Sequence, residues 1–375
     1  MPVPEVPRIL DELRRLVEAE SKSGDLPALM ACADVLAEVG TDILGGIAPR
    51  SLPTPRGPVL QWRFGPGPVR VGLVGHYDTV HPVGSIERIP FRVDGDTAFG
   101  PGTFDMKAGL LVMLYAARAM LDQDPGGLDG VVLHCCPDEE VGSPASKVLL
   151  QEAVNEGLRA ALVYEGAAPG GGIYESRRGG LWLDAVFSGR DAHASRAYEG
   201  ANALHALVDF AGRMLELAAP EVGTTVTATE AEAGTAINTA PGRARLTVDS
   251  RCTTLAEQLR IRDALTTMGS NVAGVTTQVS IIQQVPPFEL GRSQPALEVI
   301  REGLNLAGVP WPGVASGMGI SDANHLSLMG VAVVDGLGPV GGEDHSPAEW
   351  VSVSSIVERI ELSRICVTAL RKAFG

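Results

Sequence analysis

The sequence predicts an α/β protein with a central, mostly parallel sheet and a smaller α+β domain inserted into it. Three observations predict this arrangement. Short apolar strands alternate with helices over the first 165 residues, alternating strands begin near residue 180, and the first pattern resumes after Pro286 and Pro287. We therefore expect one domain over residues 1–177 and 290–375, interrupted by a second domain over residues 178–289.

The first part of the chain carries helices and buried strands in alternation. Apolar residues at helical spacing predict helices over residues 7–19, 26–39 and 107–121. Short apolar runs predict buried strands over residues 69–75, 131–136 and 161–164. Each of these strands ends in polar residues. Because open α/β sheets bind ligands at the carboxyl ends of their strands, we expect the functional site at this edge.

The rest of the chain predicts the inserted domain and the return to the first. Alternating or β-branched runs predict strands over residues 181–187, 244–248 and 276–282, and two helices lie between them over residues 202–217 and 255–267. This set predicts one antiparallel sheet with two helices. The first domain is then completed by a helix, a strand and a helix over residues 295–307, 331–334 and 354–373.

Composition excludes several classes of protein. The 375 residues fit about two domains, and 45 Asp and Glu against 30 Lys and Arg leave a net charge of −15. We expect no nucleic-acid or anionic-membrane partner, because both need a basic face. No apolar run is long enough to span a bilayer, and residues 1–5 lack the basic and apolar regions of a secretory signal. The five cysteines are scattered and lack CxxC spacing. Cys135 and Cys136 end an apolar run, which predicts that both are buried thiols in a reducing, cytoplasmic environment.

Five candidate metal ligands lie at turns that follow strands or open helices: His76, Asp105, Glu140, Glu165 and His345. Imidazole and carboxylate donors suit Zn²⁺, with Co²⁺ and Mn²⁺ as alternatives. Taken singly, each residue could be a solvated or capping side chain, and Glu139 with Glu140 could be an acid pair at a helix N-terminus. Four of the five fall inside one stretch of about ninety residues that is rich in predicted strands. This clustering favours a metal site.

Four segments resemble the M20 metallopeptidases, in order and over nearly the whole chain: Gly75–Val80, Gly100–Gly109, Asp138–Gly142 and His345–Glu349. That family contains glutamate carboxypeptidases, aminoacylases, acetylornithine deacetylase and succinyl-diaminopimelate desuccinylase. The resemblance implies a zinc-peptidase catalytic domain whose sheet is sandwiched by helices. It also implies that the inserted domain is a ferredoxin-like lid through which the protein forms a homodimer.

The resemblance implies a site for two divalent metal ions, most simply Zn²⁺. Asp105 would bridge both ions, with His76 and Glu165 completing one and Glu140 and His345 the other. It also implies a cis peptide bond between Asp105 and Met106.

Two further carboxylates would serve the chemistry. Asp78 would orient the imidazole of His76, although a turn cap at the end of the strand is the alternative. Glu139 would take a proton from the water held between the ions and return it to the leaving amine, without a covalent intermediate.

The resemblance also assigns residues outside the metal site. His193, in Ser188–Ser195, would stabilise the oxyanion in the partner's active site. Asn238 and Arg251 would hold the oxyanion and a substrate carboxylate, and Gly317 would begin a loop whose N–H groups contact the substrate. Each of these could instead be a plain turn residue or a surface charge.

The leading hypothesis is an enzyme that cleaves a C-terminal amino acid from a peptide or N-acyl amino acid. An N-acyl amino acid deacylase is the alternative. A non-catalytic binding protein on this scaffold predicts the loss of ligands or of Glu139, and all of them are present. Glu165, which is Asp in several deacylases of the family, favours a glutamate carboxypeptidase-like member. Glutamate as the released residue is in doubt, because Gln283–Val285 lacks the basic residue expected there, unless Arg177 or Arg178 compensates.

Overall fold

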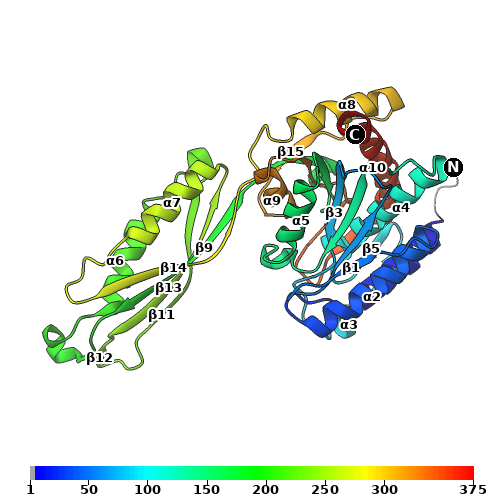
Figure 1. Cartoon of the computed structure of the whole chain (residues 1–375). Coiled ribbons are helices and arrows are strands. Elements are labelled where there is room, and N and C mark those ends of the chain that lie inside the picture. The colour runs from blue at the N-terminus through cyan, green and yellow to red at the C-terminus, as the bar shows by residue number, and fades with distance from the viewer. Residues whose placement is uncertain (1–4) are drawn as a thin grey trace. The chain divides into compact units, whose positions relative to one another are not determined.

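The computed structural model describes residues 5–375. Residues 1–4, which contain most of the segment inspected for a secretory signal, lie outside the described residues. The chain forms two compact units (Figure 1). The first unit extends to Ser176 and resumes over Leu290–Gly317 and Ser321–Gly375, and the second unit comprises Arg177–Glu289 with Met318–Ile320.

The first unit is built on a six-stranded sheet in the order β1-β2-β6-β3-β7-β16. Its strands are β1 (Arg50–Leu52), β2 (Val59–Arg63), β3 (Val71–His76), β6 (Val131–Cys136), β7 (Ala160–Val163) and β16 (Ala332–Val334). β3 pairs in parallel with β6 and β7, and β7 pairs in parallel with β16. The mostly parallel sheet predicted from the sequence is thus confirmed, with β1 and β2 added as antiparallel strands at one edge.

Helices cover both faces of this sheet, among them α4 (Ala108–Gln123), α5 (Ser146–Asn155), α9 (Asp322–Leu328) and α10 (Val353–Phe374) (Figure 1). Gly72 and Gly75 of β3 lie three residues apart and so face opposite sides. A Cβ atom at Gly75 would lie 2.9 Å from Leu110 of α4, and one at Gly72 would lie 3.1 Å from Leu158, just after α5. The helices α4 and α10 therefore pack on one face, and α5 with α9 on the other.

The start of α4 approaches the end of β7 closely. A Cβ atom at Gly109 would lie only 2.1 Å from the carbonyl oxygen of Tyr164, so glycine is required for this contact. The turn Thr103–Lys107, which precedes α4, is thereby held beside the carboxyl end of β7. Within this turn the peptide bond between Asp105 and Met106 is cis, as predicted.

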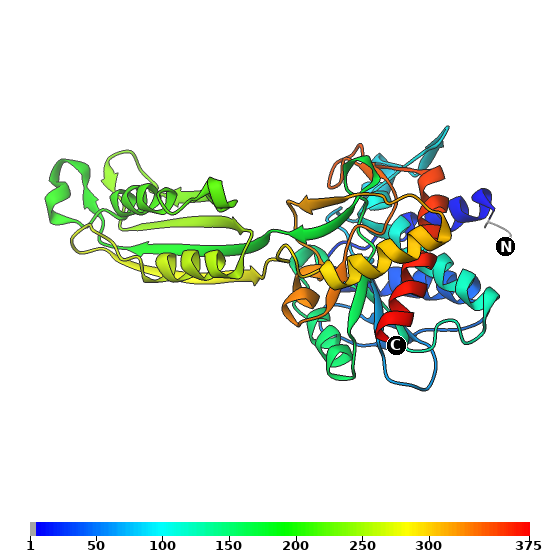
Figure 2. The same cartoon turned by 90° about the horizontal axis from the view of Figure 1, so that it is seen from above.

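The second unit has the ferredoxin-like order of strands and helices, β-α-β-β-α-β. These elements are β9 (Gly179–Ser188), α6 (Ala203–Leu215), β11 (Thr225–Ala233), β13 (Arg243–Cys252), α7 (Leu255–Thr267) and β14 (Thr276–Val285). The four strands form an antiparallel sheet in the order β11-β13-β9-β14. Both helices pack on one face (Figure 2), where Phe187 of β9 meets the ring of Phe210 of α6 at 5.4 Å.

Shorter elements and four further helices complete the described part of the chain. The helices are α1 (Val6–Glu18), α2 (Leu26–Ile43), α3 (Ser85–Arg88) and α8 (Gln294–Ala307). The strands are β4 (Arg92–Asp94), β5 (Thr97–Phe99), β8 (Ile173–Arg177), β10 (Ala192–His193), β12 (Thr239–Ala240), β15 (Val314–Gly317), β17 (Gly341–Gly342) and β18 (Trp350–Ser352). Across residues 5–375, no helix combines the length and apolar character needed to cross a membrane. All five cysteines are buried and unpaired, which confirms the buried thiols predicted at Cys135 and Cys136.

Candidate active site

The five predicted metal ligands converge at the carboxyl edge of the parallel strands. His76 is the last residue of β3, Glu140 lies in the turn that follows β6, and Glu165 follows β7. These three strands are neighbours, so their ends meet. Asp105 comes from the turn before α4, and His345 from the loop between β17 and β18.

One group of donors gathers around His76. Its Nε2 lies 3.1 Å from Oδ1 of Asp105 and 3.4 Å from Oε1 of Glu165. These three residues are close enough to one another to hold one metal ion.

A second group gathers around His345. Its Nε2 lies 3.2 Å from Oδ2 of Asp105 and 3.1 Å from Oε2 of Glu140. Asp105 therefore presents a different oxygen to each group.

Asp78 connects His76 to the turn after β6. Nδ1 of His76 donates to the backbone carbonyl of Asp78 at 3.0 Å and lies 3.4 Å from its Oδ1. With the proton on Nδ1, the lone pair of Nε2 faces the other ligands. The two carboxylate oxygens of Asp78 accept the N–H groups of Glu139 and Glu140 at 3.1 and 3.2 Å, and Ser23 donates to Oδ2 at 2.7 Å. Asp78 thus fixes both the imidazole and the acidic turn.

Glu139 lies at the border of the His76 group. It is only 6% exposed, and its Oε2 lies 3.8 Å from Nε2 of His76. Burial raises the pKa of Glu139 well above its usual range, and the nearby carboxylates Glu165 and Glu140 add to this. A buried carboxyl group with a raised pKa is suited to accept and release a proton near neutral pH.

The burial and mutual repulsion of these carboxylates favour bound cations. Burial raises the pKa of Glu140 and of Glu165 to about 7, and the neighbouring charge of Asp105 contributes to both shifts. Hydrogen bonds that His345 donates to the carboxylates of Asp105 and Glu140 raise the pKa of His345 to about 11. Without metal, the cluster therefore holds protons that divalent ions would replace.

The donor set fits such ions. Oε1 of Glu140 and Oε1 of Glu165 are buried and have no hydrogen-bond donor. Unsatisfied buried carboxylate oxygens are costly unless a cation meets them. These carboxylates, the two imidazoles and Asp105, which offers one oxygen to each histidine, are the kinds of ligand that Zn²⁺ and similar ions take.

Two residues of the His345 loop received no role from the sequence. Glu349 accepts N–H groups from the turn that carries Asp105. Asp344 forms a further group with Asp105 and His345, whose ligand atoms all lie within 4.8 Å of one another. Both residues lie within four positions of His345. The motif His345–Glu349 therefore identified this loop as part of the site but did not indicate these contacts.

The residues predicted in the second unit fall into two places. His193 pairs with Thr239 across β10 and β12, and Asn238 accepts the N–H of Ala194 at 2.8 Å, so His193 and Asn238 are neighbours. His193 is exposed.

Arg251 is not brought to this pair. It lies opposite Gly180, whereas the His193 segment follows Ser188, roughly 26 Å further along β9. Its guanidinium binds both oxygens of Asp249 at 2.8 and 2.9 Å and stacks on Trp182 at 4.7 Å. Gly317 ends β15 in the first unit and is buried.

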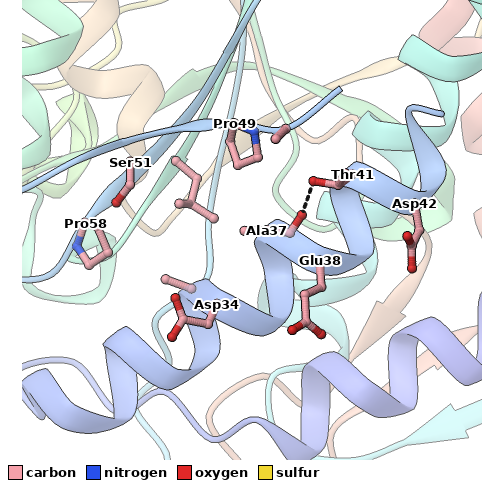
Figure 3. A pocket seen from close by; sticks show the side chains of 11 residues that line it. Asp34, Ala37, Glu38, Thr41, Asp42, Pro49, Ser51 and Pro58 are labelled. Carbon is pink, nitrogen blue, oxygen red and sulfur yellow. Dashed lines mark hydrogen bonds between the residues drawn. The ribbon is translucent and has the colours of Figure 1, made fainter. Parts of the chain in front are cut away.

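A pocket of about 560 Å³ opens elsewhere in the first unit, between α2 and the residues around β1 and β2 (Figure 3). Asp34, Glu38 and Asp42 line it from α2, and Pro49 and Pro58 line it from the opposite side. None of the predicted catalytic or metal-binding residues lines this pocket. It is therefore separate from the candidate site.

The parallel sheet with its histidine- and carboxylate-lined edge, together with the ferredoxin-like unit, defines a metal-dependent hydrolase of amide bonds. The model of the peptidase family M20/M25/M40 matches residues 72–368. The chain belongs to this family, and both the family and the fold class predicted from the sequence are confirmed.

Relatives of known name match nearly all of the chain or a part of it. Carboxypeptidase G2 of Pseudomonas sp. strain RS-16 is 27% identical over 377 residues, which cover 96% of this chain and 88% of that protein. Succinyl-diaminopimelate desuccinylase of Corynebacterium glutamicum is 33% identical over 156 residues, 41% of each chain. The crystal structure of aminopeptidase PepT from Bacillus cereus superposes with a TM-score of 0.78 at 20% identity, covering 98% of this chain and 99% of that one, which shows a common fold.

Proposed function

We propose that the protein is a dinuclear-metal amidohydrolase that releases a C-terminal amino acid from a peptide or an N-acyl amino acid. One observation carries this proposal: Asp105 presents one oxygen to His76 and the other to His345, with the buried Glu139 beside them. We take Zn²⁺ as the resident metal, since imidazole and carboxylate donors suit it.

The two ions would be held by residues of the first unit alone: one by His76 and Glu165, the other by Glu140 and His345, with Asp105 between them. When bound, such ions polarise the amide carbonyl and lower the pKa of water. Asp78 keeps the ring of His76 in the orientation that aims Nε2 at the site.

Glu139 is the proposed general base and acid. Its carboxylate borders the ligand set and is shielded from bulk water. It would accept the proton of the attacking water and deliver it to the nitrogen of the leaving amine. Burial keeps its pKa high, which makes the second transfer possible near neutral pH.

The second unit would supply substrate contacts and the dimer interface. The helix α6 exposes Leu204, Val208 and Leu215, which form an apolar stripe at helical spacing. Such a stripe supports a homodimer in which a second copy covers it. In this dimer His193 and Asn238 would stabilise the oxyanion of the partner's reaction.

The proposed recognition of the substrate carboxylate depends on Arg251 and on the Gly317 loop. Arg251 already binds Asp249 in a two-pronged ion pair, so a substrate carboxylate would have to displace Asp249. Glutamate remains one candidate for the released residue, with no cation in Gln283–Val285 to favour it.

Cleavage of a C-terminal residue is supported by carboxypeptidase G2, the relative that matches 96% of the chain. An N-acyl amino acid deacylase is the second candidate, supported by the relative named succinyl-diaminopimelate desuccinylase. The buried, unpaired cysteines support a cytoplasmic location.

A hydrolysis screen with metal analysis tests the proposal. Matched pairs of dipeptides and N-acetyl amino acids that share one C-terminal residue would be incubated with protein of known metal content. Release of that residue with two ions per chain supports the proposal, and faster cleavage of dipeptides favours the carboxypeptidase. No hydrolysis of either series by the two-metal protein would contradict it.

A further inference from the structure

Asp344 lies immediately before the predicted ligand His345, and its carboxylate lies close to both His345 and Asp105. Its carboxylate, Asp105 and Nε2 or Nδ1 of His345 form one group of possible ligand atoms, all within 4.8 Å of one another. Glu140 approaches Nε2 of His345 at 3.1 Å with a side chain that is only 6% exposed. Asp344 is itself exposed, whereas the Glu140 side chain is buried.

We infer that Asp344 is a further protein ligand of the ion held by Glu140 and His345. This inference rests on the proposed dinuclear function. It assigns the two ions unequal ligand sets. The ion at His76 would have Asp105 and Glu165 as its other protein ligands, whereas the ion at His345 would have Asp105, Glu140 and Asp344.

The distances among Asp105, Asp344 and His345 allow one ion to bind all three with a small side-chain movement. Metal–oxygen and metal–nitrogen bonds are about 2.0–2.2 Å long, so donors on opposite sides of one ion lie about 4 Å apart. The ligand atoms of Asp105, Asp344 and His345 lie within 4.8 Å of one another, so their spacing is already close to that around a bound ion. In the described part of the chain, no hydrogen bond or ion pair holds the Asp344 side chain, which leaves it able to turn towards the ion.

A second observation, the buried Oε1 of Glu140 without a hydrogen-bond donor, supports an ion at the same place. Oε1 of Glu140 is buried without a donor, while its Oε2 is the oxygen next to His345. A cation at this place would satisfy Glu140 and would attract the exposed carboxylate of Asp344 as well.

Glu343 provides a matched control. It is exposed, adjacent to Asp344 and of the same charge, but it is not part of the ligand group. Asp344→Asn and Glu343→Gln therefore remove the same charge from neighbouring positions. A purely long-range effect of charge would be similar in both variants, whereas ligation would be lost only in Asp344→Asn.

The test is a competition titration of metal-free protein with Zn²⁺ or Co²⁺ against a chelator of known affinity. We expect two ions in the wild type and in Glu343→Gln, with similar affinities. In Asp344→Asn we expect one ion to bind about 10- to 100-fold more weakly while the other is unchanged. We also expect the visible spectrum of Co²⁺ at the weakened site to change, because one ligand is lost.

Three other outcomes would overturn the inference. Equal affinities in Asp344→Asn and Glu343→Gln would mean that Asp344 is a solvated surface carboxylate. Equal weakening of both ions would indicate a general charge effect. A wild type that binds fewer than two ions would contradict the dinuclear proposal itself, and is recognised before any variant is measured. Thermal unfolding of the metal-free variants verifies that each one is folded.

Discussion

Glu349 and Asp105, 244 residues apart in the chain, are joined by a hydrogen bond in which Oε1 of Glu349 accepts the backbone N–H of Asp105 at 3.0 Å. The same carboxylate accepts the N–H groups of Phe104 and Gly102, both at 2.8 Å, and Nε2 of His81 lies 3.0 Å from Oε2. Four residues earlier, His345 contacts the side chain of Asp105. One loop therefore contacts Asp105 at both its backbone and its side chain.

Replacing Glu349 should therefore loosen the metal site. In Glu349→Gln an amide NH₂ would replace one oxygen that accepts backbone N–H groups, and the negative charge would be lost. We expect metal affinity to fall about 10- to 100-fold. The free energy of unfolding should fall by about 1–3 kcal/mol. Chelator competition and urea unfolding measure the two effects. Glu358→Gln, at an exposed position of α10, is the control, and a Glu349→Gln that matches it in both measurements would refute this role.

The close approach of α4 to β7 makes a second prediction. Gly109→Ala would place a Cβ atom 2.1 Å from the carbonyl oxygen of Tyr164, against backbone that cannot move aside freely. We expect a loss of about 1–3 kcal/mol in the free energy of unfolding. Gly212→Ala, in α6, is the control, since a Cβ there meets no atom within 4 Å. It should stabilise the protein by about 0.5–1 kcal/mol. Equal effects of the two substitutions in urea unfolding would show that the contact is not tight.

His134 predicts a pH dependence of stability. Burial lowers its pKa to about 4, and the amide nitrogen of Gln61 lies 2.8 Å from its Nε2. The unfolded chain has a histidine pKa of about 6.5, so between pH 6.5 and 4 it binds a proton that the folded state does not. The free energy of unfolding should therefore fall as the pH falls through this window, by roughly 3 kcal/mol in total.

His134→Gln keeps a polar partner for Gln61 but cannot titrate. Its unfolding free energy, measured in urea at several pH values, should decline less steeply between pH 6.5 and 4 than that of the wild type. His205→Gln, at an exposed position of α6, is the control for removing a histidine. Identical slopes for His134→Gln and the wild type would contradict the prediction.

Mixing two inactive variants tests whether His193 acts in the partner's site. We expect His193→Ala to lower kcat about 10²- to 10³-fold with unchanged metal content. Glu139→Gln should be inactive for a different reason. In a mixed dimer, the site with an intact Glu139 receives His193 from its partner, so an equal mixture should regain about one quarter of wild-type activity. If mixing after dissociation restores nothing, His193 does not act across the dimer.

Much of the fold could be predicted because the relevant segments are buried. β3 and β6 are continuous apolar runs, and Leu181–Phe187 alternates between the core and the exposed face of the second unit. The edge strand β11 was missed because its Thr, Ala and Glu side chains are mostly exposed and leave no apolar alternation to detect. β2 was missed because it follows a stretch interrupted by Pro53, Pro55 and Pro58, which is typical of a loop.

The candidate site was predictable as a set of residues but not as a set of contacts. His76, Asp105 and His345 stand in recognisable motifs, yet nothing in the sequence indicates that Asp105 offers one oxygen to each histidine. The role of Glu349 depends on backbone N–H groups more than 240 residues away, which no local pattern encodes. Likewise, the ion pair of Arg251 with Asp249 follows from the backbone geometry of β13.

The measurement that tests the account most directly is turnover by Glu139→Gln together with its metal content, on the same sample. We expect two bound ions per chain and a rate of hydrolysis lowered about 10²- to 10⁴-fold, because the proposed metal ligands are intact while the proton acceptor is gone. Glu152→Gln, on the exposed side of α5, should behave as the wild type. Near-normal hydrolysis by Glu139→Gln with both ions bound would contradict the central claim.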